Sequence, residues 1–290
     1  MSTSPEQYYA HSLIPNYPSN FTWEHLYIKL DFEDCILNLN LQQDFKALYD
    51  RIDLIADKIV NLTLYITPEN SLKSGYFYLC AVLSKLTNLK VLNIQSKLGN
   101  NSEVSYKAVS NLKKGFIKLR ESGKSQLVKI KVTNTNFNRA GNVADSILEI
   151  FNTIEHLKSL ELDRTNLLTL RDNKMANSII VNHPDITELT IIASCNNEEA
   201  AKSVADGLMR AKKIEYLVFN SNACGNGLNN LLYNLAFSPK LTVLELTGMS
   251  IYNPTIFCEN LTKLISISGA IEYLSIKDLK CFEQFLREFF

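Results

Sequence analysis

Long apolar runs, unbalanced charge and secretory features are all missing from this sequence of 290 residues. No apolar stretch approaches the roughly 18 residues that a membrane-spanning helix needs, so we expect no membrane span. The 30 basic residues equal the 30 acidic residues, which leaves no overall field to attract nucleic acid. The start, MSTSPEQYYAHSL, lacks a charged region followed by an apolar one, so we expect no secretory signal.

The six cysteines form no CxxC motif, and the closest two are 23 residues apart. They are Cys35, Cys80, Cys195, Cys224, Cys258 and Cys281. This spacing favours reduced thiols over disulfides or a metal site, and it predicts a cytoplasmic protein without cofactor or metal. A bacterial effector delivered into a host cell, or a component of a ciliary or cytoskeletal assembly, would share these features.

Motifs that carry catalysis are also missing. The sequence has no GxGxxG, Walker, GxSxG or HExxH motif, and its four histidines lack ligand spacing. The Gly-rich segment ACGNGLNN, with Gly225 and Gly227, could cradle an anion, but glycine is also the default turn residue. Glu161 and Asp163 could share a strand face, yet nothing in the sequence places a pocket beside them. We therefore expect no enzymatic activity.

One six-residue pattern, apolar-x-x-apolar-x-apolar, recurs nine times along the chain. The copies begin at Trp23, Ile59, Leu89, Leu127, Leu157, Ile186, Ile214, Leu241 and Ile271. Most steps are 27 to 30 residues, and two are longer, at 36 and 38. Repetition at such a period is the signature of a solenoid.

Between the copies, apolar residues recur at helical spacing. The clearest segments are SGYFYLCAVLSKL, AGNVADSILEIFNTI, NNEEAAKSVADGLMRAKK and NPTIFCENLTKLISI. The strand pattern resembles the leucine-rich repeat signature LxxLxLxxN/CxL, although the Asn position is poorly kept, with Thr165 in one unit. Strand–helix units of this length resemble the ribonuclease-inhibitor-like subfamily.

The resemblance implies an α/β fold, a leucine-rich repeat solenoid of about nine repeats. Parallel strands would form a sheet on the concave face of a curved horseshoe, and helices would cover the convex face. Leu157, Leu160, Leu162 and their equivalents would fill the core. We expect residues 1–22 to form an N-terminal arm or cap and residues 23–290 to form one solenoid domain. The end, CFEQFLREFF, would close the last repeat as an amphipathic helix.

The intervening strand positions should face solvent on the concave side, where apolar residues need an explanation. The predicted partner-binding residues are Glu188, Ile192, Tyr216, Val218, Asn220, Val243, Glu245 and Tyr273. Aromatic and aliphatic side chains ringed by polar ones are typical of a protein-binding surface. The alternatives are plain β-propensity on an empty sheet face, or cover from a terminal arm.

A second predicted surface is basic. It comprises Lys107, Lys113, Lys114, Lys118, Arg120, Lys124, Lys129 and Lys131. These residues could bind an acidic partner, RNA or an anionic lipid surface, although a solvated helix exterior explains them as well.

Taken with the fold, these features predict a non-catalytic scaffold for protein–protein interaction, monomeric on its own or a subunit of a larger assembly. A regulator of an enzyme, such as an activator or inhibitor of a small GTPase, is the first alternative. Binding through residues 107–131 is the second. Nucleic acid is not the expected partner.

Overall fold

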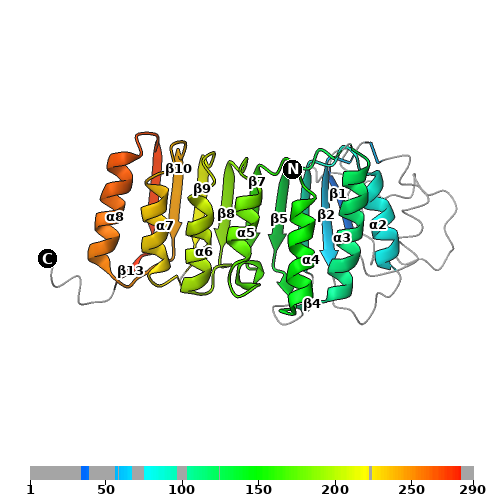
Figure 1. Cartoon of the computed structure of the whole chain (residues 1–290), viewed down its shortest axis with the longest axis horizontal. Coiled ribbons are helices and arrows are strands. Elements are labelled where there is room, and N and C mark those ends of the chain that lie inside the picture. Colours follow the sequence, from blue (N-terminus) through cyan, green and yellow to red (C-terminus); the bar gives the residue numbers. More distant parts are fainter. Residues whose placement is uncertain are drawn as a thin grey trace, which may run out of the picture.

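Strands and helices alternate along the chain in the computed structural model, which describes residues 34–38, 56–57, 59–66, 75–96, 103–123, 125–221 and 224–281 (Figure 1). The main strands are β1 Asp34–Asn38, β2 Asn61–Ile66, β3 Val91–Ser96, β5 Lys129–Thr133, β7 Ser159–Asp163, β8 Glu188–Ile192, β9 Tyr216–Asn220, β10 Val243–Thr247 and β12 Tyr273–Lys277. The helices are α2 Gly75–Lys85, α3 Tyr106–Glu121, α4 Gly141–Asn152, α5 Met175–Asn182, α6 Glu198–Leu208, α7 Gly227–Leu235 and α8 Pro254–Ile267. Shorter elements are β4 Glu103–Val104, β6 Asn136–Phe137, the 3-10 turn η5 Leu167–Thr169, β11 Ser250–Ile251 and β13 Lys280–Cys281.

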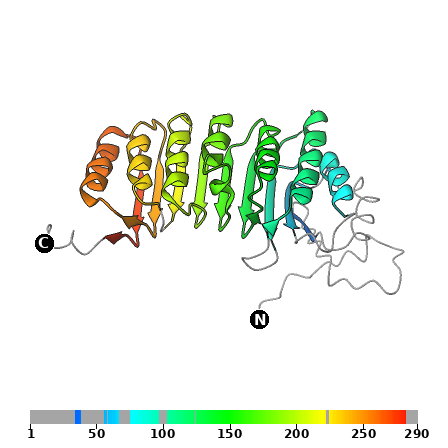
Figure 2. The same cartoon turned by 60° about the horizontal axis from the view of Figure 1, so that its bottom comes forward.

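The nine main strands form one parallel sheet in the order in which they occur along the chain. Equivalent positions of consecutive repeats pair directly, so that Leu160 lies opposite Leu189 and Leu217 lies opposite Leu244. The described helices all lie on one side of this sheet, and no described element covers its other side, which we call the open face (Figures 1 and 2). This architecture is a leucine-rich repeat solenoid, as the repeated pattern predicts.

The helix layer confirms the four segments with helical spacing, which correspond to α2, α4, α6 and α8. Asn197 caps α6, because its side-chain oxygen accepts a hydrogen bond from the Ala200 N–H at 2.8 Å. Asn253 caps α8 in the same way, with Pro254 at the start of the helix. These asparagine caps fix the first residues of α6 and α8.

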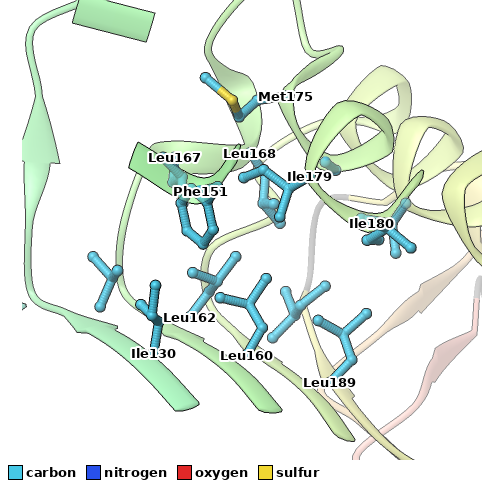
Figure 3. Packing of buried hydrophobic residues seen from close by; sticks show 14 of the residues in the cluster. Ile130, Phe151, Leu160, Leu162, Leu167, Leu168, Met175, Ile179, Ile180 and Leu189 are labelled. Carbon is cyan, nitrogen blue, oxygen red and sulfur yellow. The ribbon is translucent and has the colours of Figure 1, made fainter. Parts of the chain in front are cut away.

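The core lies between the sheet and the helices. Leu160 and Leu162 point from β7 toward Phe151 of α4 and toward Ile179 and Ile180 of α5 (Figure 3). Every one of these side chains is buried. Because each repeat contributes the same apolar positions, neighbouring repeats share one continuous core, as expected for a solenoid.

The strand that pairs with β2 on the side away from β3 differs from the strand that the sequence predicts there. The sequence pattern placed the first strand at Trp23, whereas the structure pairs β2 with β1, so that Cys35 lies opposite Leu62 and Leu37 opposite Leu64. The segment that begins at Phe32 follows the same pattern, 27 residues before Ile59, with a cysteine at one apolar position of the pattern. Trp23 lies outside the described residues, as do the predicted arm 1–22 and residues 282–290 of the predicted closing helix.

Side chains in the turn after β7 hold this repeat to its neighbours. In the unit of β7, the buried amide of Asn166 accepts from the Phe137 N–H and donates to the Phe137 carbonyl oxygen, both at 2.8 Å. Thr165 stands at the predicted Asn position, and its N–H donates to the Ser194 hydroxyl of the next repeat at 3.1 Å. In this repeat, the asparagine that bonds to the neighbouring repeat therefore stands one residue after the predicted position.

The glycines of ACGNGLNN have structural roles. Gly225 has a positive φ of 51°, and a Cβ there would lie 2.5 Å from a carboxylate oxygen of Glu198. A carboxylate at this distance would repel a bound anion. Gly227 allows α7 to approach α6 closely, so neither glycine is needed for a phosphate cradle.

His183 gives stability a dependence on pH. Burial lowers its pKa, although a hydrogen bond to the backbone of Phe151 opposes this, and its Nε2 has no partner among the described residues. The unfolded chain therefore takes up a proton before the folded chain does. We expect the free energy of unfolding to fall as the pH drops below about 6.5, the ordinary histidine pKa.

This expectation is checked by urea unfolding at a series of pH values between neutral and mildly acidic. His183→Gln should flatten the dependence, whereas His156→Gln, at an exposed histidine, should leave it in place. An unchanged dependence in His183→Gln would show that His183 does not cause it.

Candidate functional site

The open sheet face of β8, β9, β10 and β12 brings all eight predicted partner-binding residues onto one surface. Strand register places them in three rows, and the burial of alternate residues in β8, β9 and β10 turns them away from the core. The first row is Glu188, Tyr216, Val243 and Tyr273; the second contains Val218 and Glu245; the third contains Ile192 and Asn220. We call the first row the tyrosine row.

The tyrosine row presents large apolar surface to solvent. Tyr273 is 48% exposed, and Tyr216 and Val243 are half-buried beside it. Burial raises the pKa of the Tyr216 hydroxyl, and the nearby carboxylates of Glu245 and Glu188 raise it further. Tyr216 therefore stays neutral at ordinary pH and lies in a negative local field.

Carboxylates on the open face fall into two groups. Glu161 pairs with Lys131 and, at 4.0 Å, with Lys129, while Asp163 receives both hydrogen bonds of the Arg164 fork, at 3.0 and 3.1 Å. Glu188 and Glu245 have no ion-pair partner among the described residues. Uncompensated negative charge thus gathers beside the two tyrosines.

Other residues of the second and third rows frame the tyrosine row. Val218 and Ile192 are half-buried apolar side chains. Asn220 lies beside the turn after β10, because a Cβ built on Gly248 would be 3.1 Å from its side-chain oxygen. The surface thus combines apolar side chains with the polar side chains of Glu188, Asn220 and Glu245.

The basic residues lie on two separate surfaces. Lys129 and Lys131 are on β5 and pair with Glu161 across the open face. The other described residues of the set lie on α3 in the helix layer: Lys107, Lys113, Lys114, Lys118 and Arg120. Lys124 lies outside the described residues.

Two of the α3 residues form ion pairs with acidic residues of the next repeat. Lys113 contacts Glu149 at 3.0 Å, and Arg120 contacts Glu155 at 3.4 Å. Lys107, Lys114 and Lys118 are exposed. The predicted basic surface is therefore smaller than its sequence spacing implies, because neighbouring repeats supply acidic residues and a strand carries two of its members to the opposite face.

A feature that the sequence analysis missed lies on the helix layer. Tyr233 and Phe237, at 45% and 46% exposed, meet edge to face with ring centres 5.5 Å apart. The Lys263 ammonium of α8 lies 4.1 Å from the centre of the Tyr233 ring. The spacing of four residues between the two rings is the signal that could have revealed this cluster.

No group of three residues able to hold a metal ion occurs within the described ranges, and no helix there is long and apolar enough to cross a membrane. Cys80, Cys195 and Cys224 are buried and Cys258 is exposed, and none of these four is in a disulfide. The open sheet face therefore carries all eight predicted partner-binding residues.

Comparison with known proteins yields similarity of structure only. No family model matches the chain, and no curated protein matches it in sequence. Sixty-two chains of solved structures are similar, among them the crystal structure of a TLR13–ssRNA13 complex, at 13% sequence identity and a TM-score of 0.44. That similarity covers 88% of this chain, which spans 37% of the matched TLR13 chain.

Proposed function

We propose that this chain is a non-catalytic interaction scaffold that binds a partner protein on the open face of β8 to β12. The observation that carries the proposal is the tyrosine row, where Tyr216, Val243 and Tyr273 stand side by side on the sheet face turned away from the core. Aromatic residues at the centre of an interface commonly dominate its binding energy. An open parallel sheet presents such residues on one continuous surface.

The finer assignments belong to the same proposal. The strand–helix alternation and the repeat steps support the ribonuclease-inhibitor-like subtype and one solenoid domain for residues 23–290. Buried cysteines that form no disulfide in the described residues support a reducing, cytoplasmic environment. A partner that is an enzyme, such as a small GTPase, would make the chain its regulator through the same surface.

Binding of an acidic partner, RNA or lipid through α3 has less support. The pairs of Lys113 with Glu149 and of Arg120 with Glu155 reduce its charge. Three exposed lysines on one helix remain, which is a common feature of helix exteriors.

The proposal is tested by affinity capture from the native organism with quantitative mass spectrometry. Tyr216→Ala combined with Tyr273→Ala should lower recovery of the partner about tenfold or more, because truncating an interface hot spot costs about 2 kcal/mol or more. The control is Tyr106→Ala combined with Tyr233→Ala, which removes two tyrosines of the helix layer that are each 45% exposed.

Recovery should be unchanged in that control. Circular dichroism of both variants shows whether the fold is intact. Equal recovery by wild type and by the Tyr216/Tyr273 variant, with an intact fold, would contradict the proposed function.

A further inference from the structure

Tyr216 and Tyr273 flank the shorter Val243 in the tyrosine row, and we call the space above Val243 the slot. Strand register places Tyr216 opposite Val243 and Val243 opposite Tyr273, so one short side chain separates the two rings. Val243 is half-buried and supplies an apolar floor.

The width of this slot admits one flat group. Neighbouring strands are about 4.8 Å apart, so β9 and β12 are separated by about 9.6 Å across β10. A planar group in contact with both rings needs about 7–8 Å, the sum of two carbon–carbon contacts of about 3.5–4 Å. Two stacked planar groups would need three such contacts and would not fit.

Negative charge lies at the end of the slot. Glu245 is two residues beyond Val243 on the same strand, and side chains two residues apart point to the same face. Glu188 lies opposite Tyr216 on its other side. Neither carboxylate has an ion-pair partner in the described part of the chain, and Lys277, the nearest basic residue on the diagonal from Glu245, does not come within 4.0 Å of it.

We propose that the slot receives an arginine side chain carried by a segment of the partner protein. The guanidinium would stack against the rings of Tyr216 and Tyr273 and donate hydrogen bonds to the Glu245 carboxylate. This inference rests on the proposed function and names the chemistry that its surface recognises.

Arginine suits the slot better than the other candidates do. Its guanidinium is planar, always charged and less strongly hydrated than the lysine ammonium, and it stacks on aromatic faces. A carboxylate or phosphate group would be repelled by Glu188 and Glu245. A neutral aromatic side chain would fill the width but would leave both carboxylates unpaired.

The test is a titration of the full chain with the capped peptide Gly-Ser-Arg-Ser-Gly, followed through the NMR signals of isotopically labelled tyrosine. We expect saturable shifts of Tyr216 and Tyr273 with an affinity in about the millimolar range. The same peptide with citrulline, which keeps the shape and lacks the charge, should bind at least about tenfold more weakly, as expected when a charge-assisted hydrogen bond is lost.

Substitutions on the protein give the matched comparison. Glu245→Gln should weaken binding of the arginine peptide about tenfold, since it keeps the side-chain shape and removes the charge. Glu161→Gln, at a carboxylate that already pairs with Lys129 and Lys131, should change it less than about twofold.

Several results would overturn the arginine proposal. These are the absence of saturable shifts, equal binding of the citrulline peptide, tighter binding of free arginine than of the peptide, or shifts of the same tyrosines by a uridine oligonucleotide alone. Partner capture that depends on Tyr216 and Tyr273 but not on Glu245 would also reject it while leaving the proposed function standing. Partner capture that is unchanged by the Tyr216→Ala and Tyr273→Ala substitutions would reject the proposed function itself.

Discussion

Gly227→Ala should destabilise the protein by about 3 kcal/mol, because overpacking of a tight contact costs about 1–3 kcal/mol and this contact involves backbone. Gly227 is the first residue of α7 and lies directly against α6. A Cβ at this position would be 2.5 Å from the Ala201 Cβ and 2.8 Å from the Glu198 carbonyl oxygen. The two helices would have to separate, and the shared core beneath them would loosen.

Gly141→Ala is the matched control for this change. Gly141 is likewise the first residue of its helix, α4, but a Cβ there meets nothing within 4 Å. Alanine is the better helix former by about 0.5–1 kcal/mol, so Gly141→Ala should be neutral or stabilising. Chemical unfolding of both variants checks the difference, and equal free energies of unfolding would contradict the close packing of α6 and α7.

Leu160→Ala should cost about 2–5 kcal/mol, because it leaves a cavity in a core that cannot fully collapse. Leu160 is only 2% exposed and lies on β7, in the middle of the sheet, beneath α5 (Figure 3). Repeats on both sides share the contacts that it makes. Its loss should therefore lower the stability of the whole array, which chemical unfolding measures.

Leu274→Ala, at the equivalent position of β12, is the comparison. Leu274 is only half-buried, and the described residues provide no further strand beyond β12 to cover it. Since less apolar surface returns to water, the cost should be less than half of that for Leu160→Ala. An equal decrease in the free energy of unfolding for Leu274→Ala and Leu160→Ala would show that the greater burial of Leu160 does not determine its contribution to stability.

The core and the open face could both be predicted from one periodicity. Leu160 and Leu162 alternate with Glu161 and Asp163, and the same alternation recurs at nearly constant steps. This pattern predicts repeated strands that pair in register, with one face in the core and the other exposed. The sequence analysis did not include β1, because its copy of the pattern has Cys35 where the other copies have leucine or isoleucine. A copy of the pattern with a cysteine is harder to recognise than a complete copy such as WEHLYI, which lies close to it in the sequence.

The basic surface was predicted less well, because its residues were grouped by their distance along the chain. Lys129 and Lys131 occupy outward strand positions, whereas Lys107 to Arg120 belong to a helix on the other side of the core. The pairing of Lys113 with Glu149 depends on how α3 and α4 are rotated against each other. Side-chain packing between repeats decides that rotation, and it is not encoded in the repeat pattern.

Site-specific photocrosslinking in the native cell tests the central claim most directly. Val218 lies in the second row beside the tyrosines, so a photoreactive phenylalanine derivative at this position should crosslink the partner protein. The same probe in place of Tyr233, on the helix layer, should give no such product. A crosslinked partner from position 218 alone is the predicted result; a partner crosslinked from position 233 and not from 218 would contradict binding on the open sheet face.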